Sequence, residues 1–83
     1  MNVEDGMAGQ EIIRNVELAL GDGSTVSVFL RGHNEPVSVV RVHRNVATVR
    51  LEGMGNAVHD VAYSAIAGAK YAPRGAGIID GIA

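Results

Sequence analysis

The segment Asn15-Val-Glu-Leu-Ala-Leu-Gly-Asp-Gly-Ser-Thr-Val-Ser-Val-Phe-Leu-Arg31 decides the fold that we expect for this chain. Apolar residues alternate with polar or small ones in each half: Val16, Leu18 and Leu20 in Asn15–Leu20, then Val26, Val28 and Leu30 in Thr25–Arg31. A period of two is typical of a half-buried β-strand. Gly21-Asp22-Gly23-Ser24 lies between the runs, and glycines supply the positive φ that tight turns need. The segment therefore predicts a β-hairpin.

A second hairpin is predicted downstream, after a turn over Gly32–Pro36. Its strands are Pro36–His43 and Val46–Glu52, with Arg44-Asn45 as the turn. This turn pairs His43 with Val46, Arg41 with Thr48 and Val39 with Arg50. One face then carries Arg41, His43, Thr48 and Arg50, and the other carries Val40, Val42, Ala47, Val49 and Leu51. The alternative is a short helix over Val37–Arg44, which its β-branched residues disfavour.

The following segment has helical periodicity. After Gly53-Met54-Gly55, the spacing predicts a helix over Asn56–Tyr71, with Asn56 as its N-cap and Pro73 beyond its end. Apolar residues recur at the i, i+3, i+4 spacing of one helix face: Val58, Val61, Ala62, Ala65, Ile66 and Ala69. Gly75–Ala83 offers an additional short strand through Ile78 and Ile79.

These elements predict an α+β fold. Two hairpins make an antiparallel four-stranded sheet, one C-terminal helix covers it, and a short fifth strand is left open. Residues 1–13, which contain Gly6 and Gly9, are expected to form an N-terminal arm, and residues 14–83 a single domain.

Composition excludes several classes of protein. The 83 residues include no cysteine, so disulfides, thiolate metal sites and thiol nucleophiles are excluded. No histidine or carboxylate shows a recurrent ligand spacing, and we expect neither a metal nor another cofactor. The first residues are acidic, and no run of 18 apolar residues exists. We therefore expect a cytoplasmic protein without a membrane partner.

The central residues are basic. Residues 31–50 contain four arginines against one glutamate, although the net charge of the chain is −2. Arg31, Arg41, His43, Arg44 and Arg50 are therefore candidates for binding nucleic acid or another anion. Gly53 and Gly55 precede the predicted helix, whose free amides attract anions. The alternative for the arginines is a solvated face, or ion pairs with Glu17.

Catalytic residues do not gather in the sequence. His33, His43 and His59 fall in three different elements, and no serine has a base that the sequence positions. No pair of carboxylates has a reason to differ in pKa. We therefore do not expect an enzyme.

Small residues on the predicted helix suggest a contact surface. Val58, Ala62, Ala65, Gly68 and Ala69 are candidates for self-association. Glycine inside a helix costs about 1 kcal/mol relative to alanine, which points to close packing at Gly68. The neighbour is either a helix of a second subunit or the protein's own sheet.

A family resemblance rests on the same region. The segment Val49-Arg-Leu-Glu-Gly-Met-Gly-Asn-Ala-Val-His-Asp-Val-Ala-Tyr-Ser-Ala-Ile-Ala-Gly-Ala-Lys-Tyr-Ala-Pro73 resembles the Alba-type and sporulation stage V protein S superfamily of small nucleic-acid-binding proteins. The shared pattern is a strand, a glycine turn and an alanine-rich helix that runs into Ala-Pro. The resemblance implies dimers and nucleic-acid contacts near Gly53, Gly55 and Lys70. The family's first helix and most of its basic helix residues are missing here.

Three functions follow, in order of preference. The first is a non-catalytic structural module that forms homo-oligomers, as part of a larger shell or protein assembly. Small size, low charge (19% of residues) and an abundance of glycine (11 residues) favour it. The second is a nucleic-acid-binding module that uses the basic residues, and the third is a small enzyme.

Overall fold

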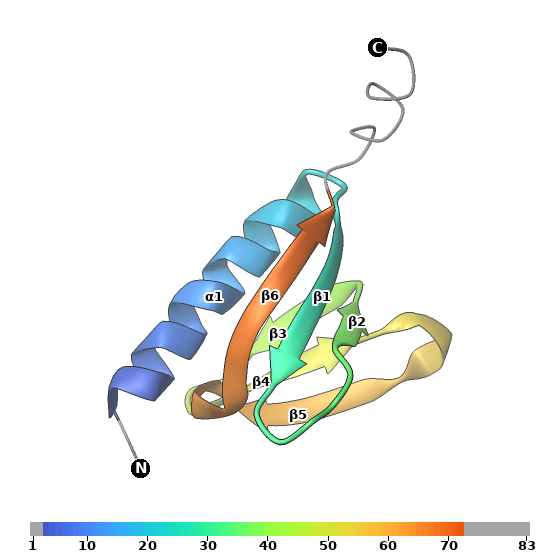
Figure 1. Ribbon diagram of the computed structural model, residues 1–83. Helices are drawn as coiled ribbons and strands as arrows, with labels where there is room; N and C mark the ends of the chain where they lie inside the picture. Colours follow the sequence, from blue (N-terminus) through green and yellow to red (C-terminus); the bar gives the residue numbers. More distant parts are fainter. Residues whose placement is uncertain (1–2, 73–83) are drawn as a thin grey trace.

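The computed structural model describes residues 3–72, which fold into one N-terminal helix and six strands (Figure 1). The elements are, in chain order, α1 (Val3–Gly21), β1 (Thr25–Leu30), β2 (Val37–Val39), β3 (Arg41–Arg44), β4 (Thr48–Glu52), the 3-10 helix η1 (Met54–Asn56), β5 (Val58–Ala62), the 3-10 helix η2 (Tyr63–Ala65) and β6 (Ile66–Ala72). The α+β class is confirmed, but the helix is at the opposite end of the chain from the predicted one.

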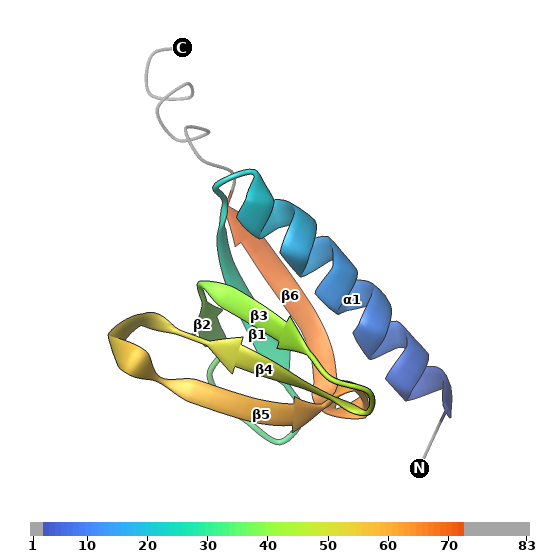
Figure 2. The ribbon, with the colours of Figure 1, turned by 180° about the vertical axis from the view of Figure 1, so that it is seen from behind.

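The strands form two antiparallel sheets of three strands each. Their orders are β2-β1-β6 and β3-β4-β5. Val40 alone separates β2 from β3, and its N–H donates to the carbonyl oxygen of Glu52 at 2.7 Å. The two are therefore halves of one bent strand that carries the chain from one sheet to the other. Figures 1 and 2 show the strands of the two sheets crossing, with α1 alongside β6.

The N-terminal helix replaces both the predicted arm (residues 1–13) and the predicted first strand (Asn15–Leu20). Ile13 and Val16 are fully buried, whereas Leu18 is 64% exposed, so Val16 and Leu18 do not share a face. Ile12, Ala19 and Leu20 pack against the core at helical spacing. The alternation of Val16, Leu18 and Leu20 fits a strand by spacing, but these residues belong to a helix whose buried face repeats about every 3.6 residues.

The glycine turn after α1 caps the helix instead of closing a hairpin. Gly23 has φ +84°, its N–H donates to the Leu20 carbonyl, and the Ser24 N–H donates to the Ala19 carbonyl at 3.0 Å. These two hydrogen bonds and the left-handed residue make a Schellman motif. Glycine adopts a positive φ readily in a hairpin turn and in a helix C-cap, so the residue type alone does not distinguish these two structures. The strand predicted after this turn, Thr25–Arg31, is confirmed as β1.

The second hairpin is present as β3 and β4, but its register differs from the predicted one. His43 pairs with Arg50, and Arg41 with Glu52, because the chain turns two residues later than predicted, between Asn45 and Thr48, where the Asn45 N–H donates to the Thr48 carbonyl at 2.9 Å. The difference is an even number of residues, so the same side chains share each face, as predicted. Val40 and Ala47 are the exceptions, because Val40 lies at the bend and is 53% exposed, and Ala47 lies exposed in the loop before β4. Val37–Arg44 contains no helix.

The predicted helix over Asn56–Tyr71 is wrong, because this segment forms η1, β5, η2 and β6. Gly55 and Asn56 have φ values of +72° and +67°, so Asn56 belongs to a left-handed turn and caps no long helix. β6 pairs with β1 from Thr25–Ala72 to Leu30–Ile66, and a bulge at Ala67 interrupts the pairing. The open alternative of a strand over Gly75–Ala83, and Pro73, lie outside the described residues.

The core lies between the two sheets and α1. Its buried residues are Ile13, Val16, Val26, Val28, Leu30, Val39, Val49, Leu51, Tyr63 and Ile66. Tyr63 is the aromatic member, and its hydroxyl donates to the Asn45 carbonyl at 3.0 Å, which satisfies the polar end of a buried ring. This bond ties η2 to the β3–β4 loop.

Candidate interaction surfaces

The outer face of β3, β4 and β5 brings together three of the candidate basic residues. Arg41 and His43 are on β3, and Arg50 lies opposite His43 on β4. The same face carries Glu52, which pairs with Arg41, and Asp60 of β5, which pairs with Arg50. The two arginines therefore face two carboxylates, and this surface carries no net positive charge while His43 is neutral.

Short ion pairs connect these residues. Arg50 binds Asp60 through two hydrogen bonds, of 2.9 Å from Nε and 3.1 Å from an Nη. Glu52 receives His43 Nε2 at 2.8 Å on one oxygen and Arg41 at 3.6 Å on the other. The fork geometry of Arg50 with Asp60 is the strongest of these contacts, because guanidinium and carboxylate match in a plane.

The pKa shifts report the same pairing. The hydrogen bond from Arg50 lowers the pKa of the Asp60 carboxyl, and the same bond raises the pKa of the Arg50 guanidinium. Both groups are exposed, so the interaction is screened by salt and contributes little to folding. An anion that binds at Arg50 has to compete with Asp60.

The remaining candidate cations lie elsewhere. Arg44 donates to Glu17 of α1 at 3.0 Å, and this hydrogen bond raises the pKa of Arg44. The predicted alternative of an ion pair with Glu17 is therefore confirmed for Arg44, with Glu17 on a helix instead of a strand. Arg31 donates from Nε to the Ser64 carbonyl at 2.9 Å. Lys70 lies on β6, opposite Ser27 of β1, so both belong to the sheet that does not contain Arg41 and Arg50.

The two candidate glycines do not precede a long helix. Gly53 donates its N–H to the Ala57 carbonyl at 2.8 Å and lies against the backbone of Ser38. Gly55 lies within the three residues of η1. Too few free amides converge at such a short turn to make the anion site that a full helix N-terminus provides.

The residues predicted to mediate self-association lie on two strands and the short turn between them instead of on one helix face. Val58 and Ala62 belong to β5, Ala65 to η2, and Gly68 and Ala69 to β6. Among residues 3–72, β5 pairs only with β4 and β6 only with β1, so both strands are sheet edges, as are β2 and β3. Val58 is 53% exposed, which leaves an apolar side chain at the β5 edge.

Gly68 lies in a strand, so the helix cost that pointed to close packing does not apply to it. It lies opposite Phe29 on β1, and a methyl group on Gly68 would lie 4.0 Å from the Phe29 ring, which is an ordinary van der Waals contact. Packing against the protein's own sheet therefore does not require glycine at this position.

The histidines do not converge. Across residues 3–72, no group of three histidine or acidic side chains is placed to hold a metal ion. His59 lies on β5 opposite Leu51, and its Nδ1 is covered without a hydrogen-bond partner. In the described part of the chain, none of the hydrogen bonds joins a serine hydroxyl to a histidine.

Comparison with protein-family models, curated proteins and solved structures gives no match for this chain. The segment that resembles the Alba-type superfamily lacks the helix on which that resemblance depends, since residues 58–62 and 66–72 are strands. The dimers and nucleic-acid contacts implied by the resemblance thus have no independent support here. None of the helices in residues 3–72 is both long and apolar enough to cross a membrane.

The sequence prediction does not include an exposed surface on α1. Met7, Glu11, Arg14 and Leu18 are exposed and follow each other at spacings of four, three and four residues along this helix. The same spacing in the sequence is typical of a helical stripe. Predicting an arm over residues 1–13 and a strand over residues 15–20 divides these four residues between two elements.

Proposed function

We propose that this protein is a non-catalytic structural module that self-associates by pairing the edge strands of neighbouring copies. The observation that carries the proposal is the pair of sheet edges at β5 and β6, beside which residues 3–72 place no further strand; β2 and β3 form the opposite edges of the two sheets. Exposed edges present unpaired N–H and C=O groups to other chains, and proteins usually shield them when pairing is unwanted.

The β5 edge is suited to pairing. Gly53 and Ala57 form a hydrogen-bonded pair at the start of the β4–β5 ladder. Hydrogen-bonded and non-bonded pairs alternate along an antiparallel ladder, so the backbone groups of Val58, Asp60 and Ala62 point away from β4. These three residues therefore offer a row of donors and acceptors to a second chain.

Ala62 allows this edge to be blocked without disturbing the fold. Its φ is −70°, which proline adopts without strain, and its N–H is among those that point away from β4. Ala62→Pro removes a donor from the edge and adds a ring that keeps a neighbouring strand away. The variant is expected to reduce the mass measured by light scattering at micromolar concentration, while the circular dichroism spectrum stays unchanged.

Ala62→Ser is the matched control, because it changes the same side chain and keeps the N–H. We expect this variant to associate like the unaltered protein. A monomeric mass for the unaltered protein at every concentration would overturn the proposal. An equal loss of association in Ala62→Ser and Ala62→Pro would mean that the N–H of the β5 edge is not responsible for the association.

A nucleic-acid-binding module is the second candidate. Arg41, His43 and Arg50 on one face favour it, and the carboxylates of Glu52 and Asp60 on the same face oppose it. An edge that pairs with another chain does not explain why these arginines share a surface. The salt dependence of oligonucleotide binding, described in the Discussion, decides between the two candidates.

A further inference from the structure

The outer face of α1 carries an exposed stripe of four residues. Met7 and Leu18 are 65% and 64% exposed, and Glu11 and Arg14 between them are also exposed. At about 100° per residue, the four side chains fall within an arc of roughly 60° on the helix. The buried residues Ile13 and Val16 lie on the opposite side, so the stripe faces away from the core.

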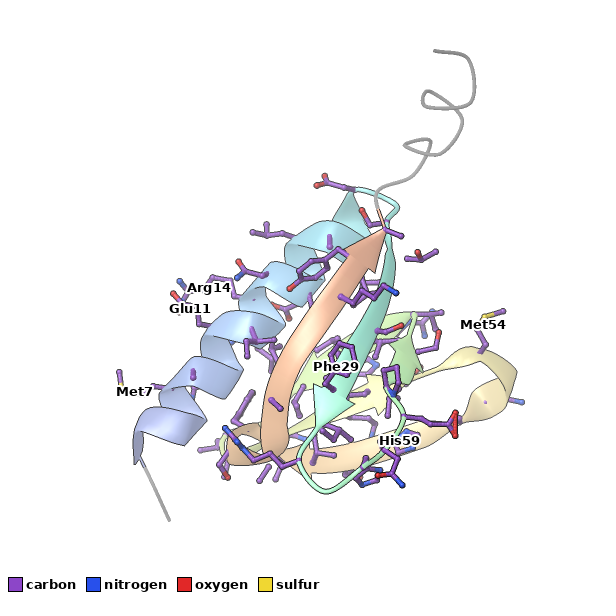
Figure 3. The ribbon with its side chains drawn as sticks, viewed as in Figure 1. Met7, Glu11, Arg14, Phe29, Met54 and His59 are labelled. Carbon is purple, nitrogen blue, oxygen red and sulfur yellow. The ribbon has the colours of Figure 1, made fainter. Side chains whose placement is uncertain are left out.

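Figure 3 shows Met7, Glu11 and Arg14 on the side of α1 that is turned away from β6. An open hollow of about 310 Å³ lies on this surface and is lined by Met7, Ala8, Gln10, Glu11 and Arg14. Two large apolar side chains and a hollow beside them make a surface that a side chain of another molecule can fill.

The order of residues in the stripe is complementary to itself when reversed. In an antiparallel pair of identical helices, Met7 lies opposite Leu18 of the second copy when Glu11 lies opposite Arg14, because both pairs of numbers sum to 25. Spacings of four, three and four residues are those of the seam of a two-helix coiled coil. A two-fold axis near residues 12 and 13 repeats both contacts on its other side.

We propose that the outer face of α1 is a second self-association surface, on which α1 of another copy packs antiparallel. Two Glu11–Arg14 ion pairs form its centre, and Met7–Leu18 contacts flank them at each end. The Leu18 side chain of the second copy is directed toward the hollow beside Met7. The midpoint of α1 is residue 12, so the two helices overlap along almost their whole length.

Charge supports this partner over an unrelated helix. Neither Glu11 nor Arg14 makes an ion pair with any other described residue, although all four arginines of residues 31–50 have polar contacts. A second copy supplies the opposite charge at both positions. A helix with another sequence would need an acidic and an arginine or lysine residue at the same spacing and in the reversed order.

This surface extends the proposed self-association but is physically separate from the β5 edge. Ala62→Pro blocks the edge, and substitutions on α1 block the helix, so each surface can fail independently of the other. If both surfaces operate, Ala62→Pro leaves a dimer, and the helix variants leave the edge-paired species.

The test uses two full-length charge variants. Glu11→Arg places two arginines on the stripe, and Arg14→Glu places two glutamates there. Each variant alone brings like charges together across the two-fold axis, and we expect the dissociation constant of the dimer to rise about tenfold or more at low ionic strength. An equimolar mixture is expected to recover association, because each chain then faces the opposite charges. Sedimentation velocity with one fluorescently labelled variant measures both effects.

The double variant Glu11→Arg, Arg14→Glu is the matched control. It contains the same two substitutions and restores both ion pairs, so it is expected to associate like the unaltered protein. Leu18→Asp gives a second readout, since it places a carboxylate where an apolar contact is proposed and should also weaken the dimer. Circular dichroism verifies that every variant remains folded.

The outcomes separate the alternatives. Single variants that associate as well as the unaltered protein, together with no gain on mixing, would overturn the helix pairing. Recovery in the mixture and in the double variant would support it. If all these variants, including the double variant, are instead monomers in the Ala62→Pro background, the exposed stripe is an ordinary solvated surface. This result also contradicts the proposal.

Discussion

Gly9 of α1 lies directly against the backbone carbonyl of Tyr63 in η2, with no room between them for a side chain. A methyl group on Gly9 would overlap the Tyr63 oxygen and its carbonyl carbon. The contact brings the helix close to the short turn that joins β5 to β6.

Gly9→Ala is therefore expected to destabilise the protein, although alanine favours a helix by about 1 kcal/mol over glycine. The methyl group forces α1 away from η2, and overpacking of this kind costs about 1–3 kcal/mol. Gly6→Ala is the matched control, because nothing lies within 4 Å of the added methyl group. We expect Gly6→Ala to raise the midpoint of thermal denaturation and Gly9→Ala to lower it. Equal midpoints in the two variants would contradict the close contact.

The Arg50–Asp60 pair predicts a specific pH dependence. The hydrogen bond from Arg50 holds the pKa of Asp60 below its usual value of about 3.9. A lowered pKa in the folded state means that the pair stabilises the fold above about pH 4 and loses this effect as the pH falls through the folded-state pKa. Arg50→Gln is expected to move the Asp60 titration, measured by carboxyl ¹³C chemical shifts, toward higher pH.

Arg41→Gln serves as the control for this titration, because Arg41 binds Glu52 instead of Asp60. The Asp60 midpoint should remain low in that variant. A midpoint that is the same in Arg50→Gln as in the unaltered protein would mean that the two-bond pair does not persist in solution.

Oligonucleotide binding distinguishes the two proposed functions. If Arg41 and Arg50 each neutralise one phosphate, the affinity falls with salt at a log–log slope of about −1.8. Arg41→Gln with Arg50→Gln should then flatten that slope, and Arg14→Gln, which removes one charge from α1, should not. Under the assembly proposal, Glu52 and Asp60 retain the arginines, and we expect no binding in about 150 mM salt. Fluorescence anisotropy with labelled single-stranded and double-stranded oligonucleotides measures both cases.

The sequence was most informative where strands pair with close neighbours in the chain. Thr25–Leu30 and the β3–β4 hairpin were predicted, and Arg41, His43 and Arg50 were placed on one face despite the error in register. Alternation identifies faces even when the predicted partner of a residue is wrong by four positions, because the side-chain period is two. The convergence of Arg50 on Asp60 could not be predicted, since Asp60 was assigned to a helix.

The errors concern segments whose pattern fits two periods. Ala62, Ala65 and Ala69 fit a helical stripe by spacing, yet alanine is small enough to occupy a strand as well. The pairing of β6 with β1 joins residues more than 35 positions apart, and local propensity carries no information about it. Local propensity also carries no information about which strands lie at the edge of a sheet, because an edge strand is one that has no second neighbouring strand.

The bend at Val40 also has a consequence for local opening. Val40 alone connects β2 to β3, and the three residues of η2 connect β5 to β6. Each sheet is thus joined to the other by two very short links, and core side chains from both sheets meet α1. Neither sheet can detach while the other keeps its hydrogen bonds, so the amides of β1 and β4 should exchange with solvent deuterium at one common, slow rate. The molecule then behaves as a single foldon in which the two sheets open together.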